Sequence, residues 1–86
     1  MDLKDKYEEY TESEFFELLR NICEVNTDDE ELHSIWVRNF VKVSEHPRGT
    51  DLIYYPEEGE DDSPEGILKT VKEWRTANGK PGFKHG

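Results

Sequence analysis

Cysteine is almost absent from this chain of 86 residues, which holds only Cys23. One thiol excludes an internal disulfide and a zinc site built from thiolates, and it fits a reducing compartment. No apolar run approaches the roughly 20 residues that cross a membrane, and the charged start Met-Asp-Leu-Lys-Asp-Lys is unlike a signal peptide. We therefore expect a cytoplasmic protein that holds no metal and no other cofactor.

Basic residues are also scarce, with 11 Lys and Arg against 21 Asp and Glu, a net charge of −10. The net charge is −9 over residues 1–31 and −5 over residues 32–65, but +4 over residues 66–86. Direct binding to nucleic acid needs a basic face, so we do not expect it. A basic protein partner would complement the negative field, whereas high solubility is the simpler explanation, and charge alone does not decide between them.

Hydrophobic residues make up only 33% of the chain, which is low enough to raise disorder as an alternative. They fall into periodic blocks instead of scattering, and ten of the residues are aromatic and able to bury large areas. We therefore expect a folded protein. Its length predicts a single domain over residues 1–86.

Three stretches of the chain show the apolar spacing of amphipathic helices. The first is predicted over about 12–24, because Thr11 and Glu14 form a capping box and an apolar stripe follows. Such helices bury one face, so the stripes are the predicted core. The core residues predicted in this way are Phe15, Leu18, Leu19 and Ile22, then Leu32, Trp36, Phe40 and Val43 with Ile35 and Val37 widening the stripe, and finally Ile67, Leu68, Val71 and Trp74.

The second and third stretches carry their own start and stop signals. Thr27 or Asp28 is the predicted cap of a helix over roughly 29–44, which ends before His46-Pro47 because proline cannot continue it. The pair Ser63-Pro64 starts the last helix, and Asn78-Gly79 supplies a left-handed stop. No strand alternation of useful length is present, so the short connections predict an all-α antiparallel bundle.

Two adjacent tyrosines lie between the second and the last of these helices. Tyr54 and Tyr55 follow Asp51 in a segment bracketed by prolines, which has room for only one short helical turn. Neighbouring side chains point in different directions, so the two rings cannot easily both be core, whereas Leu52 and Ile53 fit the core better. Exposed aromatic groups on an acidic surface are typical of a protein-binding hot spot. The alternative is that the tyrosines pack over the core and Asp51 only caps.

The second helix adds side chains to this candidate surface. They share one side of the helix and lead directly toward the tyrosine pair. The set consists of Glu30, His33, Ser34, Val37, Arg38 and Val41.

Catalytic motifs are missing: there is no Gly-rich phosphate loop, no His-Glu-x-x-His and no nucleophile elbow. His33, His46 and His85 are scattered, and His46 precedes a proline at a helix end, which favours a structural role over that of a general base. The acidic run 57–62 lacks the spacing of a calcium loop and is short for a mimic of DNA, so a solvated loop is the better interpretation. We assign no catalytic and no metal-binding residue.

Several longer stretches carry a family resemblance. Asp-Leu-Ile-Tyr-Tyr-Pro (51–56), Asp-Asp-Ser-Pro-Glu-Gly-Ile (61–67) and Lys-Glu-Trp-Arg-Thr-Ala-Asn-Gly-Lys-Pro-Gly-Phe-Lys (72–84) are the most distinctive, and Tyr-Thr-Glu-Ser-Glu-Phe (10–15) matches as well. With these stretches the chain resembles the immunity proteins of E-group DNase colicins and related pyocins over essentially its full length.

The resemblance implies a distorted antiparallel four-helix bundle with a short third helix, and an inhibitor in place of an enzyme. Its partner would be the C-terminal HNH-type DNase domain of a colicin-like toxin. The inhibitor would bind this domain one to one beside the active site and would block DNA by its bulk and its negative charge. The third helix would supply the anchor, Asp51, Tyr54 and Tyr55. The second helix would supply specificity through the set given above. An acidic antitoxin or adaptor for another basic protein is the alternative, and an enzyme using His46 is a remote third.

Overall fold

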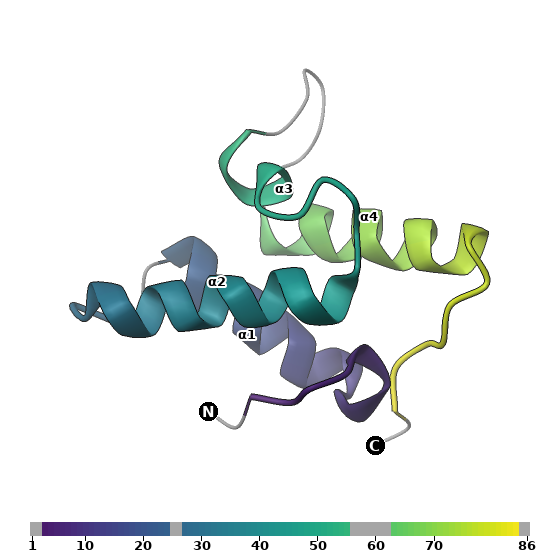
Figure 1. Cartoon of the computed structure of the whole chain (residues 1–86), viewed down its shortest axis with the longest axis horizontal. Helices are drawn as coiled ribbons and strands as arrows, with labels where there is room; N and C mark the ends of the chain where they lie inside the picture. Colours follow the sequence, from purple (N-terminus) through teal and green to yellow (C-terminus); the bar gives the residue numbers. More distant parts are fainter. Residues whose placement is uncertain (1–2, 25–26, 56–62, 85–86) are drawn as a thin grey trace.

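The computed structural model describes residues 3–24, 27–55 and 63–84, and within them the chain is helical without strands. A short 3-10 turn, η1 (Tyr7–Glu9), precedes α1 (Glu12–Glu24), α2 (Glu30–Ser44), α3 (Asp51–Tyr54) and α4 (Pro64–Ala77), as Figure 1 shows. The all-α class and the four helices with a short third one are thus confirmed. The predicted solvated acidic loop, 57–62, lies outside the described residues.

The capping box predicted at the start of α1 is present in both directions. The Thr11 hydroxyl accepts the backbone N–H of Glu14 at 3.1 Å, and the Glu14 carboxylate accepts the N–H of Thr11 at 2.8 Å. The second bond, from the Thr11 backbone to the carboxylate, is the main cause that lowers the pKa of Glu14 from its usual value. Two of the amide groups that a helix start leaves unpaired are therefore satisfied by the sequence motif itself.

The cap of α2 differs from the prediction by one or two positions. Asp29, and neither Thr27 nor Asp28, accepts from the backbone N–H groups of Glu31 and Leu32, at 3.0 and 3.3 Å. Thr27 instead accepts the N–H of Asp29 and so holds the cap residue in place. Three consecutive residues that can all cap leave the choice to the path of the preceding chain, which a local pattern does not contain.

The start and stop of α4 follow the predicted signals. The Ser63 hydroxyl accepts the N–H of Gly66 at 3.2 Å, and Pro64 occupies the first turn. Beyond the helix, Gly79 adopts the left-handed conformation with φ of 67°, which glycine adopts without steric cost.

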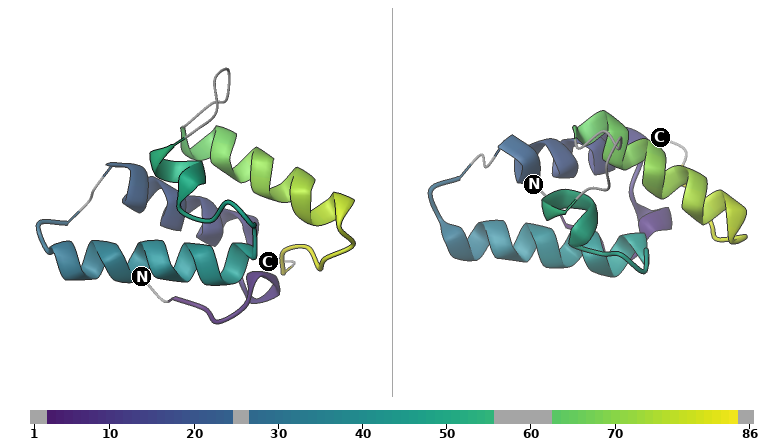
Figure 2. Two further views of the ribbon diagram at one scale, coloured as in Figure 1. Left: turned by 45° about the horizontal axis from the view of Figure 1, so that its top comes forward. Right: turned by 90° about the horizontal axis from the view of Figure 1, so that it is seen from above.

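α1 is the centre of the packing and contacts both α2 and α4. Its predicted stripe is fully buried, as are Phe40 and Val43 of α2 and Ile67 and Val71 of α4. The views in Figures 1 and 2 place α3 between α2 and the first turns of α4, away from the chain ends. At the other end, the tail returns to the N-terminal segment, where the N–H of Lys84 donates to the carbonyl of Tyr10 at 2.8 Å.

The prediction that Leu32 and Ile35 of α2 are core residues is wrong, because they are 37% and 39% exposed. Aromatic residues outside the three stripes take up core positions instead. Tyr7 and Tyr10 are buried against Phe15, and the ring of Phe83 stacks on Tyr7 with a centroid distance of 4.2 Å. The N-terminal segment and the tail therefore close the end of the core that the helices leave open.

Arg75 is buried although it is charged. In the sequence it is a cation in the last turn of a helix, where exposure is the rule, yet its side chain is 2% exposed.

Among the residues that the structure describes, no helix is long and apolar enough to cross a membrane.

Candidate protein-recognition surface

The short helix α3 turns its aliphatic residues inward and its tyrosines outward. Leu52 is buried and Ile53 packs against the core, as predicted, while Tyr54 and Tyr55 are 51% and 73% exposed. Asp51 is exposed at the start of the helix. The alternative in which both tyrosines pack over the core is therefore wrong, and this helix presents two large aromatic groups beside a carboxylate.

The turn from α2 to α3 is fixed by backbone geometry and by a histidine. Gly49 has a positive φ of 50° and donates its N–H to the carbonyl of His46 at 3.0 Å. The His46 ring accepts the N–H of Arg48 through Nδ1 at 3.1 Å and lies 5.0 Å from the Trp74 ring. His46 thus has the structural role predicted from the sequence, with its acceptor nitrogen occupied by the backbone.

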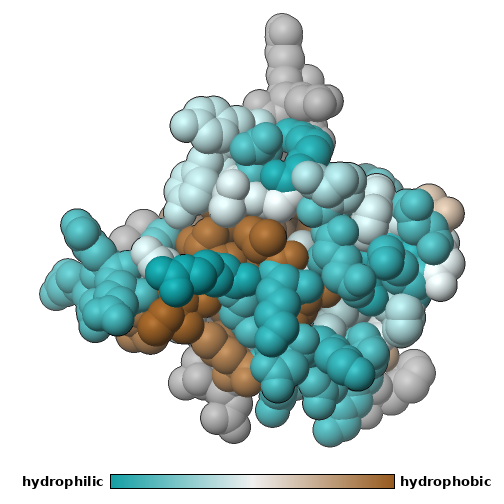
Figure 3. Space-filling view, viewed as in Figure 1, coloured by the Kyte–Doolittle hydropathy of each residue, from teal (hydrophilic) through white to brown (hydrophobic). Residues whose placement is uncertain are grey.

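Gly49 also brings the turn against α2. A side-chain carbon added at this glycine would lie 3.4 Å from a methyl group of Val41, in addition to the strain of a positive φ. Val41, a member of the predicted surface on the second helix, is half-buried at this contact. In the space-filling view of Figure 3, hydrophobic surface gathers between α2 and α3. The two helices therefore present one continuous surface.

The six α2 residues of this candidate surface are not equally exposed. Glu30, Ser34 and Arg38 are exposed and His33 is half-buried, whereas Val37 is only 7% exposed. The His33 ring is within 3.0 Å of the carbonyl oxygen of Ile22 through Nε2, so it joins α2 to the last turns of α1. The set thus combines exposed polar groups with a buried valine beneath them.

Arg48 also belongs to this surface, although no role was predicted for it. Its guanidinium donates from Nη2 to the carbonyl oxygen of Tyr55 at 3.1 Å. The sequence around Arg48 contains no pattern that indicates such a bond, because the acceptor lies seven positions further on and outside the helix. Only the fold reveals it.

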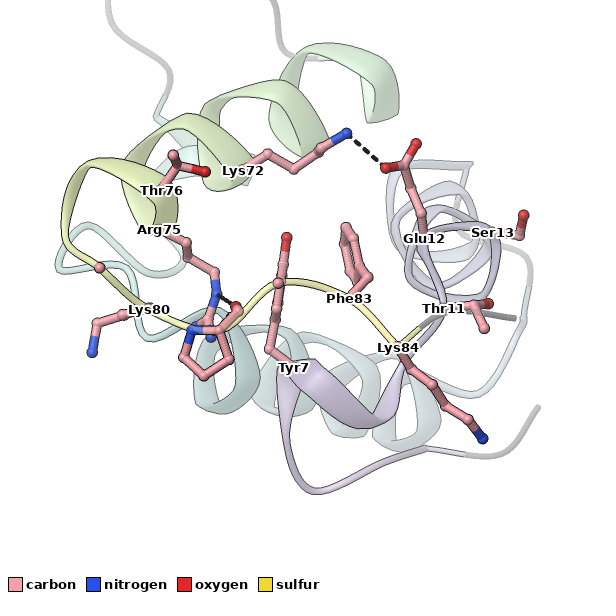
Figure 4. A pocket seen from close by; sticks show the side chains of 13 residues that line it. Tyr7, Thr11, Glu12, Ser13, Lys72, Arg75, Thr76, Lys80, Phe83 and Lys84 are labelled. Atoms are coloured by element: carbon pink, nitrogen blue, oxygen red, sulfur yellow. Dashed lines mark hydrogen bonds and ion pairs between the residues drawn. The ribbon is translucent and has the colours of Figure 1, made fainter.

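An open groove of about 790 Å³ lies elsewhere, between the start of α1, the second half of α4 and the tail. Figure 4 shows Lys72 reaching across it to the Glu12 carboxylate, at 2.6 Å. None of the predicted recognition residues lines this groove. Within residues 3–24, 27–55 and 63–84, no three potential metal ligands gather into a site. The α2–α3 surface presents exposed aromatic and polar side chains, which suits another protein better than a small substrate.

Comparison with known proteins identifies the family. Residues 7–77 match the family model described as colicin immunity protein / pyocin immunity protein. The chain belongs to this family. The pyocin-S2 immunity protein of Pseudomonas aeruginosa strain PAO1 is 49% identical over 87 residues, with 98% of this chain and 100% of the relative covered, and the pyocin-S1 immunity protein of P. aeruginosa gives the same identity and coverage.

Solved structures of the colicin and pyocin immunity family give the same result. The crystal structure of the mutant nuclease domain of pyocin S8 with its cognate immunity protein contains a chain that is 46% identical, with a TM-score of 0.89. The pyocin AP41 DNase–immunity complex contains one that is 41% identical, with a TM-score of 0.84. The matches cover 95% and 96% of this chain and all of each neighbour. The family resemblance given by the sequence is confirmed.

Proposed function

We propose that this protein is a bacteriocin immunity protein that binds and inhibits the DNase domain of a pyocin- or colicin-type toxin. The observation that carries the proposal is similarity over nearly the whole chain to immunity proteins, two of them in complexes with pyocin nuclease domains. The complex would contain one copy of each partner. It would form in the cytoplasm of the toxin-producing bacterium, where an active DNase would otherwise reach the chromosome.

The chemistry of the chain supports inhibition by occlusion. A DNase must present a basic surface to its substrate, and a protein of net charge −10 is attracted to such a surface. Once docked beside the active site, the inhibitor would keep DNA away both by its volume and by repelling phosphates. No inhibitor group needs to enter the catalytic centre.

Within this surface, Asp51, Tyr54 and Tyr55 would form the anchor. The tyrosines bring large contact areas at a small loss of rotamer freedom, and the exposed Asp51 is available to a basic partner. Because the short helix α3 has a buried Leu52 beneath it, the anchor is already in place before binding.

The α2 side chains would decide which toxin is bound. Glu30, Ser34 and Arg38 can contact a partner directly, and His33 and Val41 can do so at their exposed edges. Val37 would act mainly by supporting them, because it has little exposed area. The specificity set proposed for α2 remains Glu30, His33, Ser34, Val37, Arg38 and Val41.

The test is inhibition of DNA cleavage by a panel of toxin domains. The nuclease domains of pyocins S8 and AP41, the toxic domains of pyocins S1 and S2 and colicin DNase domains would each be titrated with the folded protein. We expect at least one to be inhibited at a one-to-one ratio. Inhibition of none would contradict the proposal. Binding to a basic protein without inhibition, retained by Tyr54→Ala and Tyr55→Ala, would instead favour an adaptor.

A further inference from the structure

Arg75 is the most enclosed charged residue that the structure describes, and all of its surroundings are specific contacts. Its guanidinium donates to backbone carbonyls of two separate segments and to one carboxylate, and it lies over an aromatic ring. The ring is that of Tyr7, whose centroid is 3.8 Å from Cζ. A cation that is removed from water needs such a complete set of partners to be tolerated.

One side of the guanidinium holds the end of α2. Nη1 donates to the carbonyl oxygens of Val43 and Ser44 at 3.2 and 3.1 Å, and to the Glu45 carboxylate at 3.2 Å. These carbonyls belong to the last turn of α2, where a helix leaves its acceptors unpaired. Glu45 leaves the helix in the left-handed conformation with φ of 59°, which is uncommon for a residue other than glycine. Arg75 therefore fixes the point at which the chain leaves α2.

The opposite side holds the tail. Nε and Nη2 both donate to the carbonyl oxygen of Pro81, at 3.3 and 3.0 Å, one of the bonds drawn in Figure 4. The five donors of an arginine reach all of these acceptors from one planar group. A lysine has one nitrogen and cannot serve both sides.

Trp74, the residue before Arg75, contacts the segment that follows Glu45. Trp74 packs against the His46 ring, and His46 in turn accepts backbone N–H groups of Arg48 and Gly49. Trp74 and Arg75, adjacent residues of α4, thus together contact the segment 43–46. The turn from His46 to Gly49 then leads directly into α3. The direction in which α3 leaves α2 is set from α4.

We propose that Arg75 is a positioning residue for recognition: it holds the left-handed exit of α2 and thereby the placement of Tyr54 and Tyr55. The part of this inference that concerns binding rests on the proposed function. Arg75 touches no part of the α2–α3 surface itself. It acts through the end of α2 and the turn that follows.

The experiment compares Arg75→Lys, which keeps the charge, with Lys72→Met as a control on the same helix. Hydrogen exchange of the backbone amides is measured over the whole chain in the free protein, and residues 43–55 are compared with the rest. Dissociation from an inhibited toxin domain is then measured for the wild type, for each variant, and for each in a Tyr55→Ala background. All measurements are made well below the midpoint of thermal unfolding, so that each variant is folded.

For Arg75→Lys we expect faster exchange confined to residues 43–55 and dissociation accelerated about tenfold or more. The acceleration should be much smaller in the Tyr55→Ala background. Displacement of α3 removes fewer contacts with the toxin domain when the Tyr55 ring is already absent. Lys72→Met should change neither. A purely structural arginine would lower the melting temperature while leaving dissociation and local exchange unchanged, and that result would overturn the proposal.

Two further outcomes are distinguishable. If no toxin domain is inhibited by the wild type, the proposed function fails, and the exchange measurement still decides whether Arg75 positions α3. If Arg75→Lys does not fold, Glu45→Ala removes the carboxylate contact of Arg75 together with the exposed ion pair between Glu45 and Lys80, and Glu45 is about half exposed, so that variant should fold. It should show the same changes at residues 43–55 in smaller measure, and unchanged exchange there would refute the inference.

Discussion

Arg48 and Tyr55 are joined by a hydrogen bond of 3.1 Å from the arginine Nη2 to the tyrosine carbonyl, and this bond ties the turn before α3 to the residue that ends it. The helix between them has only four residues, and Thr50 at its start makes no side-chain capping bond. A single turn of helix is not stable by itself, since nucleation fixes several residues for one bond. The anchor helix therefore depends on flanking contacts, of which Arg48 provides one and the buried Leu52 another.

Replacing Arg48 should consequently weaken recognition without a large effect on the fold. We expect Arg48→Met to reduce binding of the toxin domain by about 1.5–3 kcal/mol, the range for a hydrogen bond that involves a charged group. Calorimetric titration would measure it, with Lys72→Met as the control of equal charge change. If both substitutions had the same effect, general electrostatics and not the bond to Tyr55 would be responsible.

The two exposed tyrosines should affect binding alone, while a buried tyrosine should affect stability. Tyr54→Ala and Tyr55→Ala are each expected to reduce binding by about 2 kcal/mol or more, as central aromatic anchors do. Their free energies of unfolding should stay close to that of the wild type.

Tyr10→Ala is the matched buried substitution. Tyr10 is fully buried and its hydroxyl is bonded to Asn39 and to the N–H of Lys4, so we expect a loss of about 3–5 kcal/mol of stability. Denaturant unfolding and titration of the same three proteins separate the two effects. A large loss of stability on Tyr55→Ala would contradict the assignment of that ring to the surface.

Local patterns predicted the helices well because their determinants are local. The Thr11–Glu14 capping box and the Ser63 cap act within one turn, and the α1 stripe needs only the helical period. The placement of Arg75 required knowledge of two carbonyls more than thirty positions earlier and of Pro81. The exposed anchor was predictable, in contrast, because two adjacent aromatic residues on one turn cannot both face inward.

Leu32 shows where periodicity misleads. It continues the stripe of Trp36 and Phe40 but lies in the first turn of α2, and it is 37% exposed. We expect Leu32→Ala to reduce the free energy of unfolding by less than about 1 kcal/mol, because surface substitutions have small effects. Leu19→Ala, the same change at a fully buried site, should reduce it by about 2–5 kcal/mol. Equal losses would mean that Leu32 is part of the core after all.

The negative field should act mainly on the rate of association. With a net charge of −10 and a basic partner, the association rate constant should fall by about tenfold or more as salt is raised from low to high concentration. The dissociation rate should change much less, because it depends on close contacts. Stopped-flow mixing over a series of sodium chloride concentrations gives both. An association rate that does not depend on salt would argue against electrostatic attraction.

Tyr7 should make the stability of the protein depend on pH above 10. Its ring is buried under the Arg75 guanidinium, and its hydroxyl points into the open groove, as Figure 4 shows. Burial raises the pKa of Tyr7 to about 12, although the charge of Arg75 acts in the opposite direction. The folded protein therefore keeps this proton between pH 10 and 12, where the unfolded chain has lost it.

Because the unfolded state binds fewer protons in that range, the free energy of unfolding should decrease as pH rises, by up to about 1.4 kcal/mol per pH unit for this one group. Tyr7→Phe keeps the ring and its contacts with Phe83 and Arg75 but removes the ionisable group. We expect the variant to lose stability less steeply between pH 10 and 12, and to show the same pH dependence as the wild type below pH 9. Urea unfolding at closely spaced pH values would measure the two slopes, and parallel curves above pH 10 would show that the Tyr7 proton does not contribute.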